Sequence, residues 1–219
     1  MAPVVRFRSA VALLGRFPAL AGVDLDVGAG EIVLLQGANG AGKTTLLRAC
    51  AGLVQVVSGQ AEVLGHDLCR DRRTVRRSIG LLGHAGTLYD DLTVEDNVRF
   101  AVRAGGGDVA AVGPAMAQLG IDGRLRTTAV GRLSAGQRRR VAIAAVVARS
   151  PALWLLDEPH AGLDAEGRDL LDGLVRSAVR NGTTVVLASH EAERASALAG
   201  RTVILGGGRV LAREAAHVA

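Results

Sequence analysis

The sequence predicts an α/β protein in which a block of helices interrupts an alternation of strands and helices. Short apolar segments, typical of buried strands, occupy most of the first third of the chain. The pattern becomes helical over residues 85–149, where Ser134 and Gln137 have capping-box spacing. Strands and helices then alternate up to a C-terminal hairpin. We expect strands at 4–7, 23–27, 31–35, 60–64, 79–82, 153–156, 183–188, 203–205 and 209–211, and helices after the glycine-rich loop and at 93–103, 109–119, 134–149, 165–180 and 191–198.

The composition suits one globular domain. Its 219 residues are 49% hydrophobic but only 2% aromatic, so the core must consist of Val, Leu, Ala and Ile. No apolar run reaches the roughly 18 residues that span a bilayer. The two cysteines, Cys50 and Cys69, have no metal or redox spacing, which favours a reducing compartment.

The chain is basic, with a net charge of +5 and a pI near 10.4. Its arginine clusters, at 70–77 and 138–140, have no aromatic residues between them for base stacking. We therefore expect no direct nucleic-acid binding and interpret both clusters as solvated helix faces. Contact with anionic lipid or an acidic partner stays open.

A phosphate-binding loop follows the strand predicted at 31–35. The loop has the pattern G-x-x-x-x-G-K-[ST], and its lysine, Lys43, is the one lysine of the chain. Glycines let the loop turn tightly and direct N–H groups at oxyanions, while the following helix start favours negative charge. A hydroxyl at Thr44 suits Mg²⁺. The residues expected to surround the phosphates are Gly37, Asn39, Gly40, Ala41, Gly42, Lys43, Thr44 and Thr45.

An acid pair, Asp157 and Glu158, ends the strand predicted at 153–156. Four apolar residues before the pair indicate a buried parallel strand, and ligands bind at the carboxyl ends of such strands. We expect Asp157 to hold Mg²⁺ and Glu158 to act as the general base on an attacking water.

A third motif, the segment Leu-Ser-Ala-Gly-Gln at 133–137, resembles the signature of ABC-type ATPases. Two further segments resemble family motifs: Ala-Gly-Leu-Asp at 161–164 resembles the D-loop, and Ser189-His190 the switch histidine. The resemblance covers nearly the whole chain. It implies a single ABC ATP-binding domain with a P-loop NTPase fold: a RecA-like core with an antiparallel β subdomain at 1–84 and 151–219, and an inserted helical subdomain at about 85–150 that carries the signature.

The resemblance also implies how the domain works. ABC domains pair head to tail, and each ATP lies between the phosphate loop of one subunit and the signature of the other. Ser134, Gly136 and Gln137 would then contact the partner's ATP, and His190 would bind the γ-phosphate. A chain with one such half needs a second, and we expect a homodimer.

Three positions depart from the family pattern. The signature has Ala135 in place of its usual second-position glycine. His84 occupies the slot of the usual glutamine, where it would face Mg²⁺ or water. The aromatic residue that stacks on adenine is replaced by Leu14 in its usual slot, so we assign stacking to nearby Phe17.

Three segments resemble the ATP-binding subunits of cytochrome c maturation (haem exporter) ABC systems: Gly83-His84 in place of the usual glutamine segment, the signature at 133–137, and residues 151–156 followed by Asp157-Glu158-Pro159. That resemblance implies an ATP hydrolase on the cytoplasmic face of the cell membrane, bound to integral membrane subunits, with ATP and Mg²⁺ as cofactors and no haem bound by the chain itself. Two alternatives stay open: the ATPase of another exporter, for drugs, lipids or peptides, and a soluble ABC ATPase acting on nucleic acid or ribosomes. A plain GTPase or kinase is disfavoured by the signature and His190.

Overall fold

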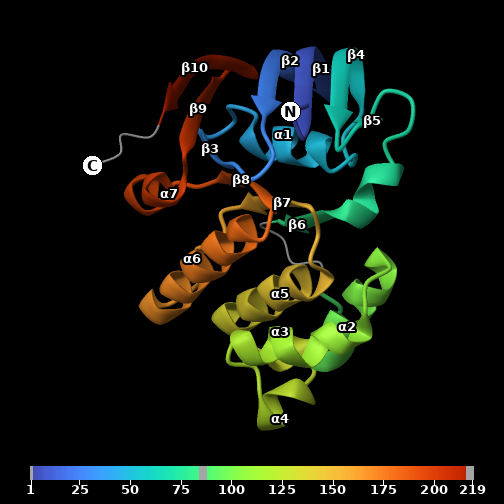
Figure 1. Ribbon diagram of the computed structural model, residues 1–219, viewed down its shortest axis with the longest axis vertical. Helices are drawn as coiled ribbons and strands as arrows, with labels where there is room; N and C mark the ends of the chain where they lie inside the picture. The colour runs from blue at the N-terminus through green and yellow to red at the C-terminus, as the bar shows by residue number, and fades with distance from the viewer. Residues whose placement is uncertain (1, 84–87, 216–219) are drawn as a thin grey trace.

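The computed structural model describes residues 2–83 and 88–215 and contains two β-sheets and a block of helices (Figure 1). The smaller sheet is antiparallel and has the order β2-β1-β4-β5, with β1 Val5–Leu14, β2 Phe17–Val27, β4 Val56–Val63 and β5 His66–Asp67. The larger sheet has the order β10-β9-β3-β8-β7-β6. Its strands are β3 Ile32–Gln36, β6 Ile79–Leu82, β7 Leu153–Asp157, β8 Thr184–Ala188, β9 Arg201–Gly206 and β10 Arg209–Ala215, and all but β10 run parallel.

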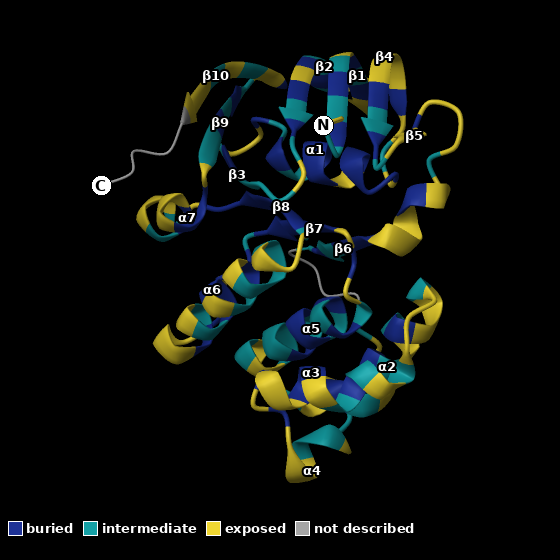
Figure 2. Cartoon of the chain, viewed as in Figure 1, coloured by how far each residue is buried: buried dark blue, intermediate teal, exposed yellow. Residues whose placement is uncertain are grey.

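The central strands of the larger sheet, β7 and β8, are buried on both faces (Figure 2). Alternate residues of one strand point to opposite faces. Leu153 and Leu155 of β7 join a core that includes the smaller sheet and α1 Lys43–Cys50. Trp154 and Leu156 join a second core with the helices on the other side. The continuous apolar run that predicts β7 therefore arises because this strand faces a hydrophobic core on each side.

Helices cover the second face of the larger sheet. They are α2 Val94–Gly105, α3 Val112–Gln118, α4 Gly123–Arg126, α5 Ala135–Arg149, α6 Ala165–Arg180 and α7 Ala192–Leu198, with short 3₁₀ segments η1 Thr74–Ser78, η2 Val109–Ala111 and η3 Val130–Arg132. Helices α2, α3, α4 and α5 form a block that lies apart from the antiparallel sheet (Figure 1). Within the described ranges, no helix combines the length and apolar character needed to cross a bilayer.

The hairpin β1–β2 is much longer than the strands predicted from its sequence. Register shifts interrupt the pairing of β1 with β2, and Ser9 has a φ of +44°. Such bulges break the apolar alternation that marks a strand. Another segment, 109–119, was predicted as one helix and is divided into η2 and α3, where Asp108 caps the first piece.

Candidate functional site

The loop between β3 and α1 needs glycine at two positions for steric reasons. Gly37 has a φ of +144°, and a Cβ there would lie 2.2 Å from the carbonyl oxygen of Leu205. Gly42 has a φ of +106°, and a Cβ there would lie 2.8 Å from the carbonyl oxygen of Ala19. Both glycines let neighbouring strands approach a loop that turns back on itself.

Lys43 lies at the start of α1 and is 8% exposed. Its ammonium donates hydrogen bonds to the carbonyl oxygens of Gly37 at 2.7 Å and Ala38 at 3.1 Å. The loop thus curls around one buried positive charge, and the expected role of Lys43 in binding phosphate stays a prediction.

Asp157 lies at the carboxyl end of β7, next to this loop. The residue is 6% exposed, and its carboxylate accepts a hydrogen bond of 2.8 Å from the hydroxyl of Thr44. These are hard oxygen donors, and Mg²⁺ usually takes only one or two carboxylates, together with water and substrate phosphates. In the described residues, no three His, Cys, Asp or Glu side chains gather as a metal site. His84, the third expected ligand, lies outside the described residues.

Glu158 follows Asp157 in a left-handed conformation, with a φ of +48°. The turn directs its carboxylate at the end of β8, where the backbone N–H of His190 donates a hydrogen bond of 3.0 Å to it. The His190 imidazole Nε2 lies 3.4 Å from the same carboxylate. The two residues that the sequence predicts to be catalytic are therefore in contact.

These groups line one cavity of about 390 Å³. Its walls comprise Leu14, Ala19, Asn39, Gly40, Ala41, Gly42, Lys43, Thr44, Thr45, Asp157, Glu158 and His190. Phe17, assigned to adenine stacking from the sequence, is 80% exposed and is not part of this lining, whereas Leu14 is. Stacking on Phe17 stays a prediction that the cavity lining does not support.

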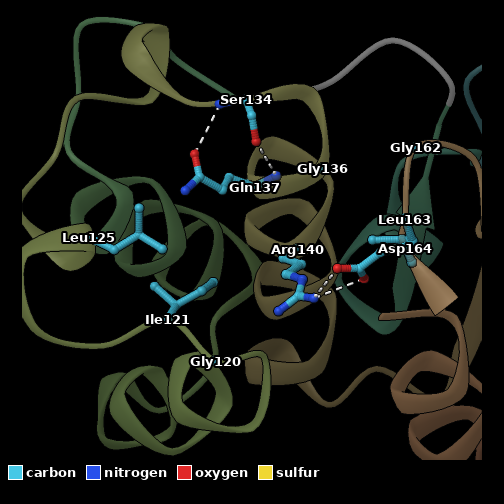
Figure 3. Close-up of a pocket in the computed structure, with 10 residues that line it drawn as sticks. All are labelled: Gly120, Ile121, Leu125, Ser134, Gly136, Gln137, Arg140, Gly162, Leu163 and Asp164. Carbon is cyan, nitrogen blue, oxygen red and sulfur yellow. Dashed lines mark hydrogen bonds and ion pairs between the residues drawn. The ribbon is translucent and has the colours of Figure 1, made fainter. Parts of the chain in front are cut away.

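The signature segment forms a second cavity, of about 420 Å³ (Figure 3). Ser134 caps α5 by accepting a hydrogen bond from the Gln137 amide, and the Gln137 side chain accepts one from the Ser134 amide. Across the cavity, Asp164 pairs with Arg140 at 3.0 Å. Hydrogen bonds from the Gly167 amide and from Arg140 hold the pKa of Asp164 below its usual value. Among the described residues, none lines both this cavity and the one at the phosphate loop.

The interpretation of 138–140 as a solvated helix face is wrong. Successive helical residues lie about 100° apart, so three in a row cannot share one face. Arg138 pairs with Asp90 at 2.7 Å, Arg140 pairs with Asp164, and Arg139 points toward the acid pair. None of the three contacts was predicted from the sequence, although the 100° spacing already excludes one shared solvated face.

Sequence reasoning also missed a buried ionic cluster behind the D-loop segment. His160 is 1% exposed and its Nε2 lies 2.8 Å from Asp172, which also accepts a hydrogen bond of 2.5 Å from Arg194. The cluster ties the segment after the acid pair to α6 and α7. His160 belongs to no sequence motif, so its contact with Asp172 is seen only in the folded structure.

Comparisons with known proteins identify the family of the chain. The ABC transporter family model matches residues 20–161. The "Cytochrome c biogenesis ATP-binding export protein CcmA" of Cupriavidus pinatubonensis is 35% identical over 98% of this chain and 91% of its own. The protein of the same name in Xanthomonas axonopodis pv. citri is 38% identical over 86% of this chain and 87% of its own. "ATP-binding cassette sub-family A member 7" of Mus musculus is 36% identical over 87% of this chain but only 9% of its own.

Solved structures show the same fold. The ATP-binding subunit of an ABC transporter superimposes with a TM-score of 0.88 at 27% identity, covering 97% of this chain and 90% of the other. A dimeric bacterial ABC transporter cassette superimposes with a TM-score of 0.89 at 23% identity, covering 97% and 99%. The predicted P-loop NTPase fold is confirmed. The chain belongs to the ABC transporter family and is an ATP-hydrolysing cassette of that family.

Proposed function

We propose that this chain hydrolyses ATP to drive the export step of cytochrome c biogenesis, with haem as the cargo of its membrane partners. The observation that carries the proposal is identity of 35% and 38% over 98% and 86% of the chain to proteins named for that export step. The sequence similarity to these proteins extends over nearly the whole chain and is not confined to the nucleotide-binding motifs.

In the proposed reaction, Lys43 and the loop amides bind the β- and γ-phosphates of ATP. Thr44 and Asp157 would hold Mg²⁺, which when bound neutralises charge on the phosphate oxygens. Glu158 takes a proton from a water molecule as the water oxygen attacks the γ-phosphorus. The bond between that phosphorus and the bridging oxygen breaks, leaving ADP and inorganic phosphate. His190 is placed to hydrogen-bond the γ-phosphate because it already lies against Glu158.

The proposed active form is a head-to-tail homodimer. The phosphate-loop cavity and the signature cavity share no lining residue within the described part of the chain. A dimeric ABC transporter cassette has the same fold, and in such a pair one copy would present Ser134, Gly136 and Gln137 to the ATP held by the other. The pair would sit on the cytoplasmic face of the membrane, bound to integral transporter subunits.

Another exporter is the second candidate. The mouse sub-family A protein, whose name does not refer to cytochrome c biogenesis, matches most of this chain at 36% identity, so identity in this range does not by itself assign the chain to that export step. Its match spans only 9% of that protein, whereas the cytochrome c biogenesis proteins match over most of their length, which favours the first candidate.

The test is a covalent-haem stain of membrane c-type cytochromes in the native host after deletion of this chain. Rescue is attempted with the wild-type chain and with Glu158→Gln. Loss of the stain that only the wild-type chain restores supports the proposal. An unchanged stain leaves the ATPase in place and refutes the cytochrome c assignment, and the membrane subunit that co-purifies then identifies the exporter.

A further inference from the structure

The side chain of Arg139 binds the backbone at the ends of two neighbouring strands. Its guanidinium donates hydrogen bonds to the carbonyl oxygen of Gly83, after β6, at 2.8 Å and to that of Asp157, at the end of β7, at 3.0 Å. It also donates to the carbonyl oxygens of Pro159, at 3.2 Å, and of Glu158. One side chain from α5 thus contacts three consecutive peptide groups around the acid pair.

The backbone that Arg139 binds is in an unfavourable conformation. A φ of +48° at Glu158 is uncommon for a residue with a side chain, and such conformations persist only where the surroundings hold them. The Glu158 amide donates to the carbonyl oxygen of Ala188 at 2.8 Å, and its carbonyl also accepts from the Ala161 amide at 3.2 Å. Among the hydrogen bonds of the described residues, Arg139 is the one side chain that donates to the backbone carbonyl oxygens of this turn.

The helix that carries Arg139 is itself fixed at its start. The capping box of Ser134 and Gln137 begins α5, and the flanking arginines bind other segments: Arg138 contacts Asp90, and Arg140 contacts Asp164. Arg139 is therefore the arginine of this run that links the helical block to the strand ends of the larger sheet.

We propose that Arg139 is a positioning residue for ATP hydrolysis, which holds the turn at Glu158 so that its carboxylate faces the attacking water. This inference rests on the general-base role of Glu158 in the proposed function. The consequence is that the rate of hydrolysis depends on how α5 is seated against β6 and β7, because Arg139 transmits that placement to the catalytic carboxylate through the backbone.

The chemistry of the side chain supports this role. A guanidinium offers five N–H donors in a planar fork, whereas a lysine ammonium is a compact point charge that cannot reach four separated carbonyl oxygens at once. Burial lowers the pKa of Arg139, while the charges of Asp157 and Glu158 raise it in opposition. The two carboxylates thus offset part of the cost of burying the cation.

The experiment compares Arg139→Lys and Arg139→Gln with the matched control Arg138→Lys, in the full-length purified protein. Steady-state ATPase gives kcat and KM, and titration with a fluorescent ATP analogue gives the binding-competent fraction by which each rate is normalised. Because a displacement of about 1 Å at a catalytic group can cost ~100-fold in rate, we expect both Arg139 variants to lose about 10- to 100-fold in kcat, with KM for ATP within about 2-fold of wild type. Arg138→Lys should keep the wild-type kcat. A kcat within about 2-fold of wild type in both Arg139 variants would overturn the proposal.

A double-mutant cycle separates positioning from a general structural effect. Single-turnover hydrolysis of radiolabelled ATP is measured for Glu158→Gln with and without Arg139→Lys. If Arg139 acts through Glu158, the second substitution adds less than about 2-fold to the loss. A further loss as large as that seen in the wild-type background contradicts the inference, since it shows an effect independent of Glu158. A normal rate in Glu158→Gln alone would instead refute the proposed general base on which the inference depends.

Discussion

The hydroxyl of Thr44 donates a hydrogen bond of 2.8 Å to the carboxylate of Asp157, across 113 residues of sequence. Thr44 lies in the first turn of α1, and Asp157 ends β7. The contact therefore joins the phosphate loop to the strand that carries the acid pair. Two oxygen atoms of the kind that Mg²⁺ prefers therefore lie within hydrogen-bond distance of each other.

Replacing the Thr44 hydroxyl should raise the Mg²⁺ requirement of ATP hydrolysis. For Thr44→Val we expect the Mg²⁺ concentration at half-maximal rate to rise about 5- to 10-fold, which corresponds to the loss of one hydrogen-bonding oxygen. Thr44→Ser keeps the hydroxyl and should stay near wild type. Mg²⁺ titration of ATPase activity measures both. An equal Mg²⁺ requirement in all three proteins would show that Thr44 does not support the ion.

Lys43→Ala should weaken ATP binding about 10- to 100-fold, because it removes a charge-assisted contact to phosphate. Lys43→Arg should also bind weakly. The ammonium lies 2.7 Å from the Gly37 carbonyl oxygen in a site that is 8% exposed, and a planar guanidinium does not fit there. Equilibrium titration with a fluorescent nucleotide gives both affinities. Wild-type affinity in Lys43→Arg would mean that charge alone matters at this position.

Ser134→Ala should lower both the stability of the chain and its ATPase activity. Loss of an N-cap typically costs about 1 kcal/mol, which lowers Tm by about 2–4 °C for a domain of this size. Thr93→Ala is the matched control because Thr93 caps α2 by accepting from the Asp96 amide. It should show a similar Tm shift with normal ATPase activity. Equal activity in the two variants would leave Ser134 as a helix cap without a role in catalysis.

An aromatic side chain at Leu14 should tighten ATP binding, because Leu14 lines the phosphate-loop cavity and could then stack on the base. For Leu14→Phe we expect a gain of about 2- to 10-fold in affinity, the range of one aromatic stacking contact. Phe17→Leu tests the assignment made from the sequence, and the cavity lining leads us to expect no change. Isothermal titration with ATP distinguishes the two, and weaker binding by Phe17→Leu would restore the original assignment.

Much of the site follows from the sequence because its motifs are local. The loop around Lys43 and the acid pair after β7 are contiguous, and parallel strands bring their carboxyl ends to one edge of a sheet, where Asp157, Glu158 and His190 meet. The capping box at Ser134 was also predicted, since its two hydrogen bonds span three residues.

The parts that could not be predicted depend on contacts without a sequence pattern. Arg139 binds backbone carbonyl oxygens, which every residue type provides, so no spacing marks its partners. His160 and Asp172 pair only after α6 folds against the segment that follows the acid pair. The full length of β1 could not be predicted because the bulge near Ser9 interrupts the alternation of apolar and polar residues that marks a strand.

The most direct test of the catalytic account is the behaviour of Glu158→Gln with ATP. Light scattering coupled to gel filtration measures its mass with ATP and with ADP, and a phosphate-release assay measures its turnover. We predict retained ATP binding, turnover reduced by roughly 10²–10⁴-fold, and a stable dimer with ATP but a monomer with ADP. Normal turnover, or a monomer in saturating ATP, would contradict the account of Glu158 as the base in a nucleotide-closed dimer.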